Sequence, residues 1–197
     1  MSIARTWQAA SGEPRLYRRM VVLAAAILLI DQASKAWAIS ALSDGREITL
    51  IPDLLRLRLL YNPGAAFSIG AGTTWVFTVA TAVTVAAVLF VGRRLRSAAW
   101  TAALGGLLGG AGSHLLDRLS RDPGFGRGHV VDFIDYGVFV GNIADIALTV
   151  TCAVLFLLNL RGVPLGGTAG KERPEPEPPA AEDDAAPSAR TERSEQS

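Results

Sequence analysis

The segment TTWVFTVATAVTVAAVLFVG, residues 73–92, decides the class of fold. It contains no charged residue, whereas a soluble helix of this length would present a polar face that recurs about every 3.6 residues. Three other apolar runs have similar lengths: Val21–Leu42, Ser97–Leu116 and Tyr136–Leu160. A membrane span needs roughly 20 mostly apolar residues. The sequence therefore predicts an all-α membrane protein with four transmembrane helices.

The arginines indicate how these four runs are oriented. Residues 1–20 are rich in arginine, and the short link after the second run reads GRRLRS. The positive-inside rule assigns both segments to the cytoplasm, and both termini with them. The loops at about residues 43–72 and 117–135 balance arginine with acidic residues, so we expect them to face outward. The first contains REITLIPDLLRLRLL, whose short alternating stretches are typical of strands and leave open a small extracytoplasmic sheet between the first two helices.

Composition divides the chain into three parts. Residues 1–17 form a cytoplasmic N-terminal tail, residues 18–161 the four-helix transmembrane domain, and residues 162–197 a cytoplasmic C-terminal tail. The C-terminal tail is rich in Pro, Glu and Ala and has almost no large apolar residues, a composition typical of disorder. We expect truncation after about Gly167 to leave the activity of the protein intact.

Ionisable side chains inside the predicted spans are costly, by roughly 3 kcal/mol each, and are usually paired or functional. In DQASK, residues 31–35, Asp31 and Lys35 lie four apart and share one helix face. A structural ion pair explains this motif alone equally well. YNPGAAFSIG, residues 61–70, contains a turn signal, and a turn at the membrane boundary is a sufficient explanation for it.

A pair of carboxylates points to chemistry. Asp132 stands in an apolar stretch, and Asn142 and Asp145 lie three apart near the start of the fourth run. In the predicted topology, Asp31, Asp132 and Asp145 all fall toward the outer side of the membrane. Two carboxylates held close in a low-dielectric site share a proton, so one can act as a general base on water while the other polarises a carbonyl. This is the chemistry of an aspartic protease, and it needs no metal or cofactor.

Five short motifs, taken in order, resemble those of the lipoprotein signal peptidase family, signal peptidase II. They read DQASK (31–35), NPGAAF (62–67), SHLLDR (113–118), VVDF (130–133) and NIAD (142–145). The resemblance covers roughly residues 20–160 and matches the layout of four spans. It implies a hydrolase of the bacterial cytoplasmic membrane, with its active site near the extracytoplasmic face. It also implies removal of the signal peptide from prolipoproteins that carry diacylglyceryl on a cysteine, by cleavage just before that cysteine.

The resemblance also implies roles for particular residues. Asp132 and Asp145 would be the catalytic dyad. The residues that would shape the site or bind the substrate are Asp31, Lys35, Asn62, Gly64, Arg118, Asn142 and His114. Besides the prolipoprotein we expect membrane lipid as a partner, no nucleic acid, no metal or cofactor, and a monomer.

The sequence departs from the family pattern near the site. His114 stands where the family usually has Asn, and Ser113 where it usually has Gly. Gly141 stands where a Phe commonly precedes the fourth-span motif, which removes apolar surface near the site, and the loop before Val130 is longer than expected. None of these changes touches the dyad. His114 changes one substrate-side hydrogen bond or makes it depend on pH.

Two rival functions remain. In a small ion-coupled transporter or channel, Asp31, Asp132 and Asp145 would bind ions in turn. The acidic residues gather on one side of the membrane, however, and the cytoplasmic half has no acid to complete a path. In a non-enzymatic assembly factor the polar residues would only hold helices together, and neither aspartate would matter beyond folding.

Overall fold

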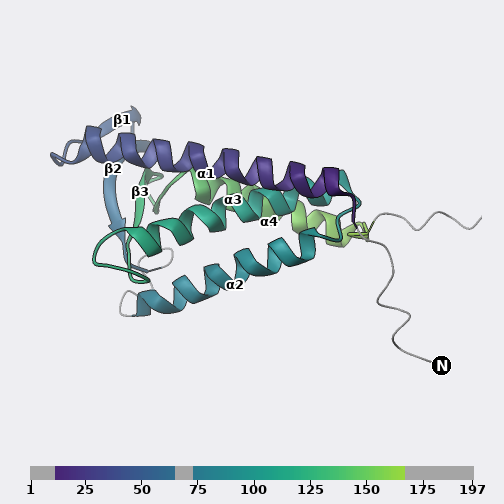
Figure 1. Cartoon of the computed structure of the whole chain (residues 1–197). Helices are drawn as coiled ribbons and strands as arrows, with labels where there is room; N and C mark the ends of the chain where they lie inside the picture. Colours follow the sequence, from purple (N-terminus) through teal and green to yellow (C-terminus); the bar gives the residue numbers. More distant parts are fainter. Residues whose placement is uncertain (1–11, 65–72, 167–197) are drawn as a thin grey trace, which may run out of the picture.

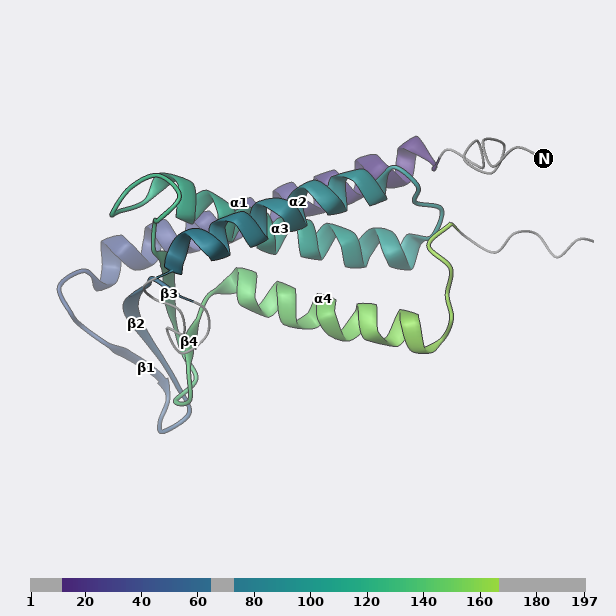
Figure 2. The same ribbon diagram turned by 90° about the horizontal axis from the view of Figure 1, so that it is seen from below.

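The computed structural model describes residues 12–64 and 73–166 (Figure 1). The described part of the chain contains α1 (Pro14–Leu42), β1 (Ile48–Ile51), β2 (Leu55–Asn62), α2 (Thr74–Gly92), α3 (Ala98–Ser120), β3 (Val130–Asp135), β4 (Val140–Gly141) and α4 (Ile143–Leu160). The helices run side by side, and the strands form one sheet at one end of them (Figures 1 and 2). Most of both predicted tails lies outside the described residues.

Helix α3 is the centre of the bundle, because it packs against each of the other three helices. Its glycines allow this close approach. A Cβ at Gly109 would lie 2.8 Å from the carbonyl oxygen of Ala24 on α1, and a Cβ at Gly110 would lie 2.6 Å from Cγ of Leu148 on α4. Adjacent glycines of α3 thus face two different helices, as close packing in membranes requires.

Three helices of the described residues are long and apolar enough to cross a membrane, namely α1, α2 and α4. Helix α2 exposes a column of large apolar side chains: Trp75, Val79, Val83 and Phe90. Such a surface suits lipid better than water. Helix α3, the third run of the sequence, is not among the three, because it is rich in glycine and ends in polar and charged residues.

The sheet is antiparallel with strand order β1-β2-β3-β4. Strands β1 and β2 confirm the small sheet that the alternation within residues 43–72 suggested. The sheet is larger than this, because β2 pairs with β3, about 70 residues further along the chain, with Leu60 opposite Asp132 and Asn62 opposite Val130. The connection expected at about residues 117–135 starts later than predicted, because α3 reaches Ser120, and it contains β3 from Val130, a strand that the sequence did not predict.

The fourth apolar run is also shorter as a helix than expected. The sequence predicted a span from Tyr136, but the helix begins at Ile143. The residues before it turn back at Gly137, which has a positive φ of 79°, and form β4 against β3. Asn142 then caps α4. The last residue of the sheet is therefore followed directly by the cap of the helix, which brings Asp132 and Asp145 to the same place.

Candidate active site

Asp132 lies on β3 and is 2% exposed. Both of its carboxylate oxygens accept hydrogen bonds from side-chain amides. Asn62 Nδ2 donates to Oδ2 over 3.0 Å, and Asn142 Nδ2 donates to Oδ1 over 2.6 Å. Asn62 reaches this position because β2 and β3 are neighbours in the sheet, and Asn142 because it follows β4. The sheet therefore brings both amides to one carboxylate.

Backbone contacts fix the orientation of these two amides. Asn62 Oδ1 accepts the N–H of Gly64 over 3.0 Å, and Asn142 Oδ1 accepts the N–H of Asp145 over 3.0 Å. With their oxygens committed to N–H donors, both amides present their NH₂ groups to the buried carboxylate.

Asp145 occupies the third position of α4 and completes a capping box with Asn142. Its Oδ2 accepts the backbone N–H of Asn142 over 2.9 Å. The start of a helix carries partial positive charge, which favours an ionised carboxylate there. The Asp145 side chain is 35% exposed. One asparagine therefore connects the two aspartates, one of them buried and the other open to solvent.

The environments of the two carboxylates differ in a way that matters for proton transfer. Burial raises the pKa of Asp132 to about 7, although the amide donors of Asn62 and Asn142 oppose the rise. The negative charge of Asp145 also raises it. At neutral pH a substantial fraction of Asp132 is therefore protonated.

A buried cluster of charged side chains contacts the start of α4. Asp31 Oδ1 accepts the N–H of Ala144 over 2.8 Å, and its Oδ2 accepts the hydroxyl of Ser113 over 2.6 Å. Lys35 Nζ lies 2.6 Å from Asp31 and 2.7 Å from Asp117, and all three charged side chains are 0% exposed. Asp31 and Lys35 thus hold helices together behind the dyad.

Arg118 is engaged with the backbone. Its guanidinium donates to the carbonyl oxygens of Pro63, Gly64 and Gly128 and lies 5.5 Å from the centre of the Phe77 ring. These bonds hold the turn that follows β2. Although Arg118 reaches the cavity wall, its donors serve carbonyls of the chain itself, so its contacts are those of a residue that shapes the site.

A cavity of about 720 Å³ opens beside the two aspartates. Asp132 and Asp145 line one end of it. The other end lies between α2 and α4, where Phe77 and Thr81 face it from α2 and Cys152 from α4. Cys152 is seven residues beyond Asp145, which on a helix is about two turns or roughly 10 Å. The cavity therefore extends from the carboxylates along the helices.

Gly141, one of the departures from the family pattern, adjoins the dyad. A Cβ there would lie 3.0 Å from Oδ2 of Asp145 and 3.3 Å from Cε2 of Phe139. Phe139 itself lines the cavity. A side chain at position 141 would crowd the carboxylate of Asp145 unless one of these neighbours moved.

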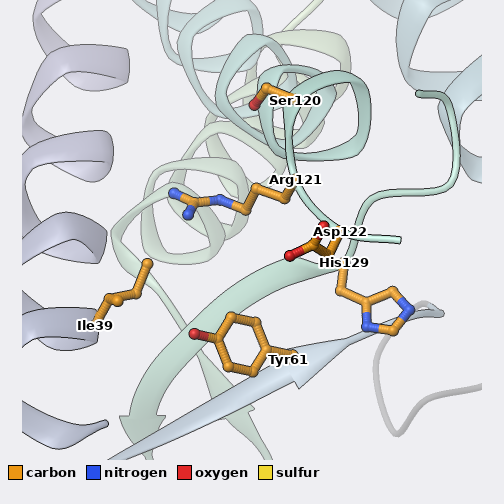
Figure 3. A pocket seen from close by; sticks show the side chains of 6 residues that line it. All are labelled: Ile39, Tyr61, Ser120, Arg121, Asp122 and His129. Atoms are coloured by element: carbon orange, nitrogen blue, oxygen red, sulfur yellow. The ribbon is translucent and has the colours of Figure 1, made fainter. Parts of the chain in front are cut away.

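A second cavity, of about 630 Å³, has Ile39 of α1 and Tyr61 of β2 in its lining (Figure 3). Tyr61 points into this cavity. Because Tyr61 directly precedes Asn62, which contacts Asp132, the two side chains point to opposite faces of the sheet. The guanidinium of Arg121 also lines the cavity, but it is already bonded to Asp117 over 2.6 Å. Asp122 adds a negative charge to the cavity wall. These charges give an anion no net attraction, so we assign this cavity no ligand.

The sequence missed the residues that complete the ionic cluster. Gln32 Nε2 donates to Ser113 Oγ over 2.8 Å and to Asp117 Oδ1 over 3.0 Å. Asp117 was seen only as part of a motif, and Gln32 was not singled out. Gln32 is a polar residue next to Asp31 inside a predicted membrane span, and this position was the signal that could have identified it.

Three comparisons relate this arrangement to known proteins. A family model described as signal peptidase (SPase) II matches residues 23–161. A lipoprotein signal peptidase of Leifsonia xyli subsp. xyli is 42% identical over 150 residues, 75% of this chain and 69% of that protein. One of Bifidobacterium longum subsp. infantis is 45% identical over 153 residues, 76% of this chain and 84% of that protein. A solved structure described as a bacterial membrane enzyme matches with a TM-score of 0.61 at 25% identity, covering 80% of this chain and 94% of that one.

These matches, together with three apolar helices long enough to cross a bilayer, make the chain a membrane peptidase. More narrowly, the chain belongs to the signal peptidase II family. The resemblance noted from the five motifs is thereby confirmed.

Proposed function

We propose that this chain is an aspartic endopeptidase that removes signal peptides from diacylglyceryl-modified prolipoproteins, cutting just before the lipidated cysteine. The observation that carries the proposal is the asparagine bridge. Asn142 donates to Asp132 through its Nδ2 and accepts from Asp145 through its Oδ1, so the two carboxylates belong to one rigid unit beside a cavity. Their different surroundings suit two different roles in one reaction.

In the proposed reaction Asp145 is the general base and Asp132 holds the proton of the pair. Asp145 Oδ1 removes a proton from water, and the water oxygen attacks the carbonyl carbon of the peptide bond. The Asp132 O–H donates a hydrogen bond to the carbonyl oxygen, where negative charge develops. The C–N bond then breaks, and the proton held by Asp145 passes to the leaving nitrogen, which becomes the amino group of the lipidated cysteine.

We further propose that α3 crosses the membrane in addition to α1, α2 and α4, which makes four spans. Both termini would then lie in the cytoplasm. The start of α1 bonds to the link between α2 and α3, through Gly12 N–H to Arg93 O at 3.0 Å. The segment that follows α4 bonds to the same link, because Arg96 N–H donates to Leu165 O over 3.3 Å. This arginine-rich end is opposite the sheet (Figure 1). The positive-inside rule then supports an active site near the extracytoplasmic face of the bacterial cytoplasmic membrane.

The proposed substrate enters from the bilayer. The cavity continues from the dyad between α2 and α4, whose outer faces are apolar, and both a signal helix and acyl chains are apolar. We propose that the enzyme works as a monomer with membrane lipid and substrate as its partners.

The test is cleavage of a synthetic precursor, with and without diacylglyceryl on its cysteine, by the purified protein in lipid. We expect only the lipidated precursor to be cut, and mass spectrometry to give a product that begins at the lipidated cysteine. Equal cleavage of both precursors would refute the substrate assignment, and cleavage of neither would refute the proposed activity.

A further inference from the structure

His114 on α3 lies within reach of both the dyad and its bridge. Its Nε2 is 3.5 Å from Oδ1 of Asp145 and 3.4 Å from Oδ1 of Asn142. The side chain is 16% exposed. The sequence assigned His114 to the substrate side, yet both of its polar neighbours here belong to the site itself.

The hydrogen bonds around Asn142 determine which histidine nitrogen carries a proton. Asn142 Nδ2 faces two acceptors, Asp132 Oδ1 at 2.6 Å and the carbonyl oxygen of Val131 at 3.3 Å. Asn142 Oδ1 faces a donor, the N–H of Asp145. The amide oxygen therefore points toward His114, and the other neighbour is a carboxylate oxygen. Since both neighbours are acceptors, the tautomer that suits them is the one with a hydrogen on Nε2.

The carboxylate oxygen near His114 is Asp145 Oδ1, which the capping box leaves open. Oδ2 is bound by the backbone N–H of Asn142. Oδ1 is the oxygen that the proposed reaction uses to take a proton from water. A donor at Oδ1 limits rotation of the carboxylate.

We propose that His114 is a positioning residue that holds Asp145 Oδ1 toward the cavity through its Nε2–H. The role of His114 in turnover rests on the proposed function, whereas the protonation of its Nε2 does not depend on that function. The hydrogen-bond contact of His114 is with Asn142 Oδ1 at 3.4 Å, and Asp145 Oδ1 lies beside it at 3.5 Å from Nε2. His114 acts through Asp145 and needs no contact with the substrate.

The kinetic test compares His114→Gln with His114→Leu. The amide nitrogen of Gln reaches about as far as Nε2 of His and donates a hydrogen without titrating near neutral pH, whereas Leu fills the space and donates nothing. We expect Leu to lower kcat roughly 10- to 100-fold with KM changed less than about twofold, because orienting contacts typically have effects of this size. We expect Gln to recover most of the loss, and both variants to keep the wild-type melting temperature within a few degrees.

Unchanged kcat in His114→Leu, a loss confined to KM, or equal losses in Leu and Gln would each overturn the positioning role. A second measurement does not depend on activity. In protein labelled with ¹⁵N-histidine, and with His129→Gln to assign the two signals, the Nε2 shift of His114 should be that of a protonated nitrogen. An unprotonated Nε2 would overturn the inference even in an active enzyme. Inactive wild type with a protonated Nε2 would instead refute only the proposed function and the role in turnover that rests on it.

Discussion

At the scale of single residues, the site depends on where each amide finds its partners. Asp132 is buried on a strand, and burial would leave its charge costly without the two amides that donate to it. The same burial is what raises its pKa to about 7. A carboxyl group that is protonated near neutral pH can donate a hydrogen bond, which an ordinary aspartate cannot do.

The pKa of Asp132 predicts how the rate of cleavage depends on pH. If Asp132 must carry the proton, kcat/KM should fall as the pH rises through about 7, because the carboxyl group loses its proton there. Replacing Asn62 by Ala removes a donor that lowers this pKa, so the fall should move to higher pH while the maximal rate drops. The measurement is kcat/KM from pH 5 to 9 for both proteins.

Asn159→Ala is a suitable control, because its Nδ2 donates to the carbonyl of Leu155 at the far end of α4. It should leave the profile unchanged. A fall in wild type that does not move in Asn62→Ala, or moves to lower pH, contradicts the assignment of this limb to Asp132.

At the scale of elements, the start of α4 is the point on which the site depends. Asn142 caps it and Asp31 accepts one of its free N–H groups, so the helix that carries Asp145 is tied to α1. Lys35 lies between Asp31 and Asp117, where all three side chains are buried, and Arg121 supplies a second cation to Asp117. Helices α1, α3 and α4 therefore meet at this cluster.

Replacing Lys35 by Met should destabilise the protein by roughly 3–5 kcal/mol, because it leaves the buried carboxylate of Asp31 without a cation and Asp117 with Arg121 alone. Thermal unfolding in detergent measures this. Arg46→Met is the matched control, since Arg46 pairs with Asp44 on the surface, where both are more than half exposed. The control should melt as wild type does. Adding Asp31→Asn to Lys35→Met should restore part of the loss, because it removes the carboxylate that Arg121 does not pair with. A Lys35→Met protein as stable as wild type would show that the cluster is not charged as described.

The cavity between α2 and α4 can be probed through Cys152, the chain's one cysteine. It is exposed and lines this cavity. A maleimide should label it, a saturating lipidated precursor should slow the labelling at least about tenfold, and a labelled enzyme should lose activity. Cys152→Ser should remain active and unlabelled. Labelling that the precursor does not slow would mean that the substrate does not occupy this part of the cavity.

At the scale of the whole molecule, the sequence predicted what depends on composition and missed what depends on pairing over long distances. Apolar runs located the helices, because membrane length and burial act on each segment alone. Strand β3 was missed because VVDFID is apolar with isolated acids and becomes a strand only when β2 is beside it. The start of α4 was placed too early because the run from Tyr136 is apolar throughout, and only the turn at Gly137 and the cap at Asn142 interrupt it.

The same division holds for the candidate site. The aspartates and the asparagines stood out because polar residues in apolar stretches are rare. The structure brings Asp132, Asn142, Asn62 and Asp145 together, and their roles stay predictions. The partners of Arg118 and the place of Gln32 depend on how α1, α3 and the turn after β2 pack, which spacing along the sequence does not encode.

The central claim is that two carboxylates joined through Asn142 carry the reaction. The most direct measurement is cleavage of a diacylglyceryl-modified precursor by wild type, Asp132→Asn and Asp145→Asn, with melting temperatures to show that each is folded. Asn has nearly the shape of Asp but neither accepts nor donates a proton in the reaction, so the account predicts that both variants stay folded and lose at least about a thousandfold in turnover. If either variant is folded and cleaves at the wild-type rate, the two aspartates are not a catalytic dyad. Ion transport or helix assembly would then be the remaining explanations for these side chains.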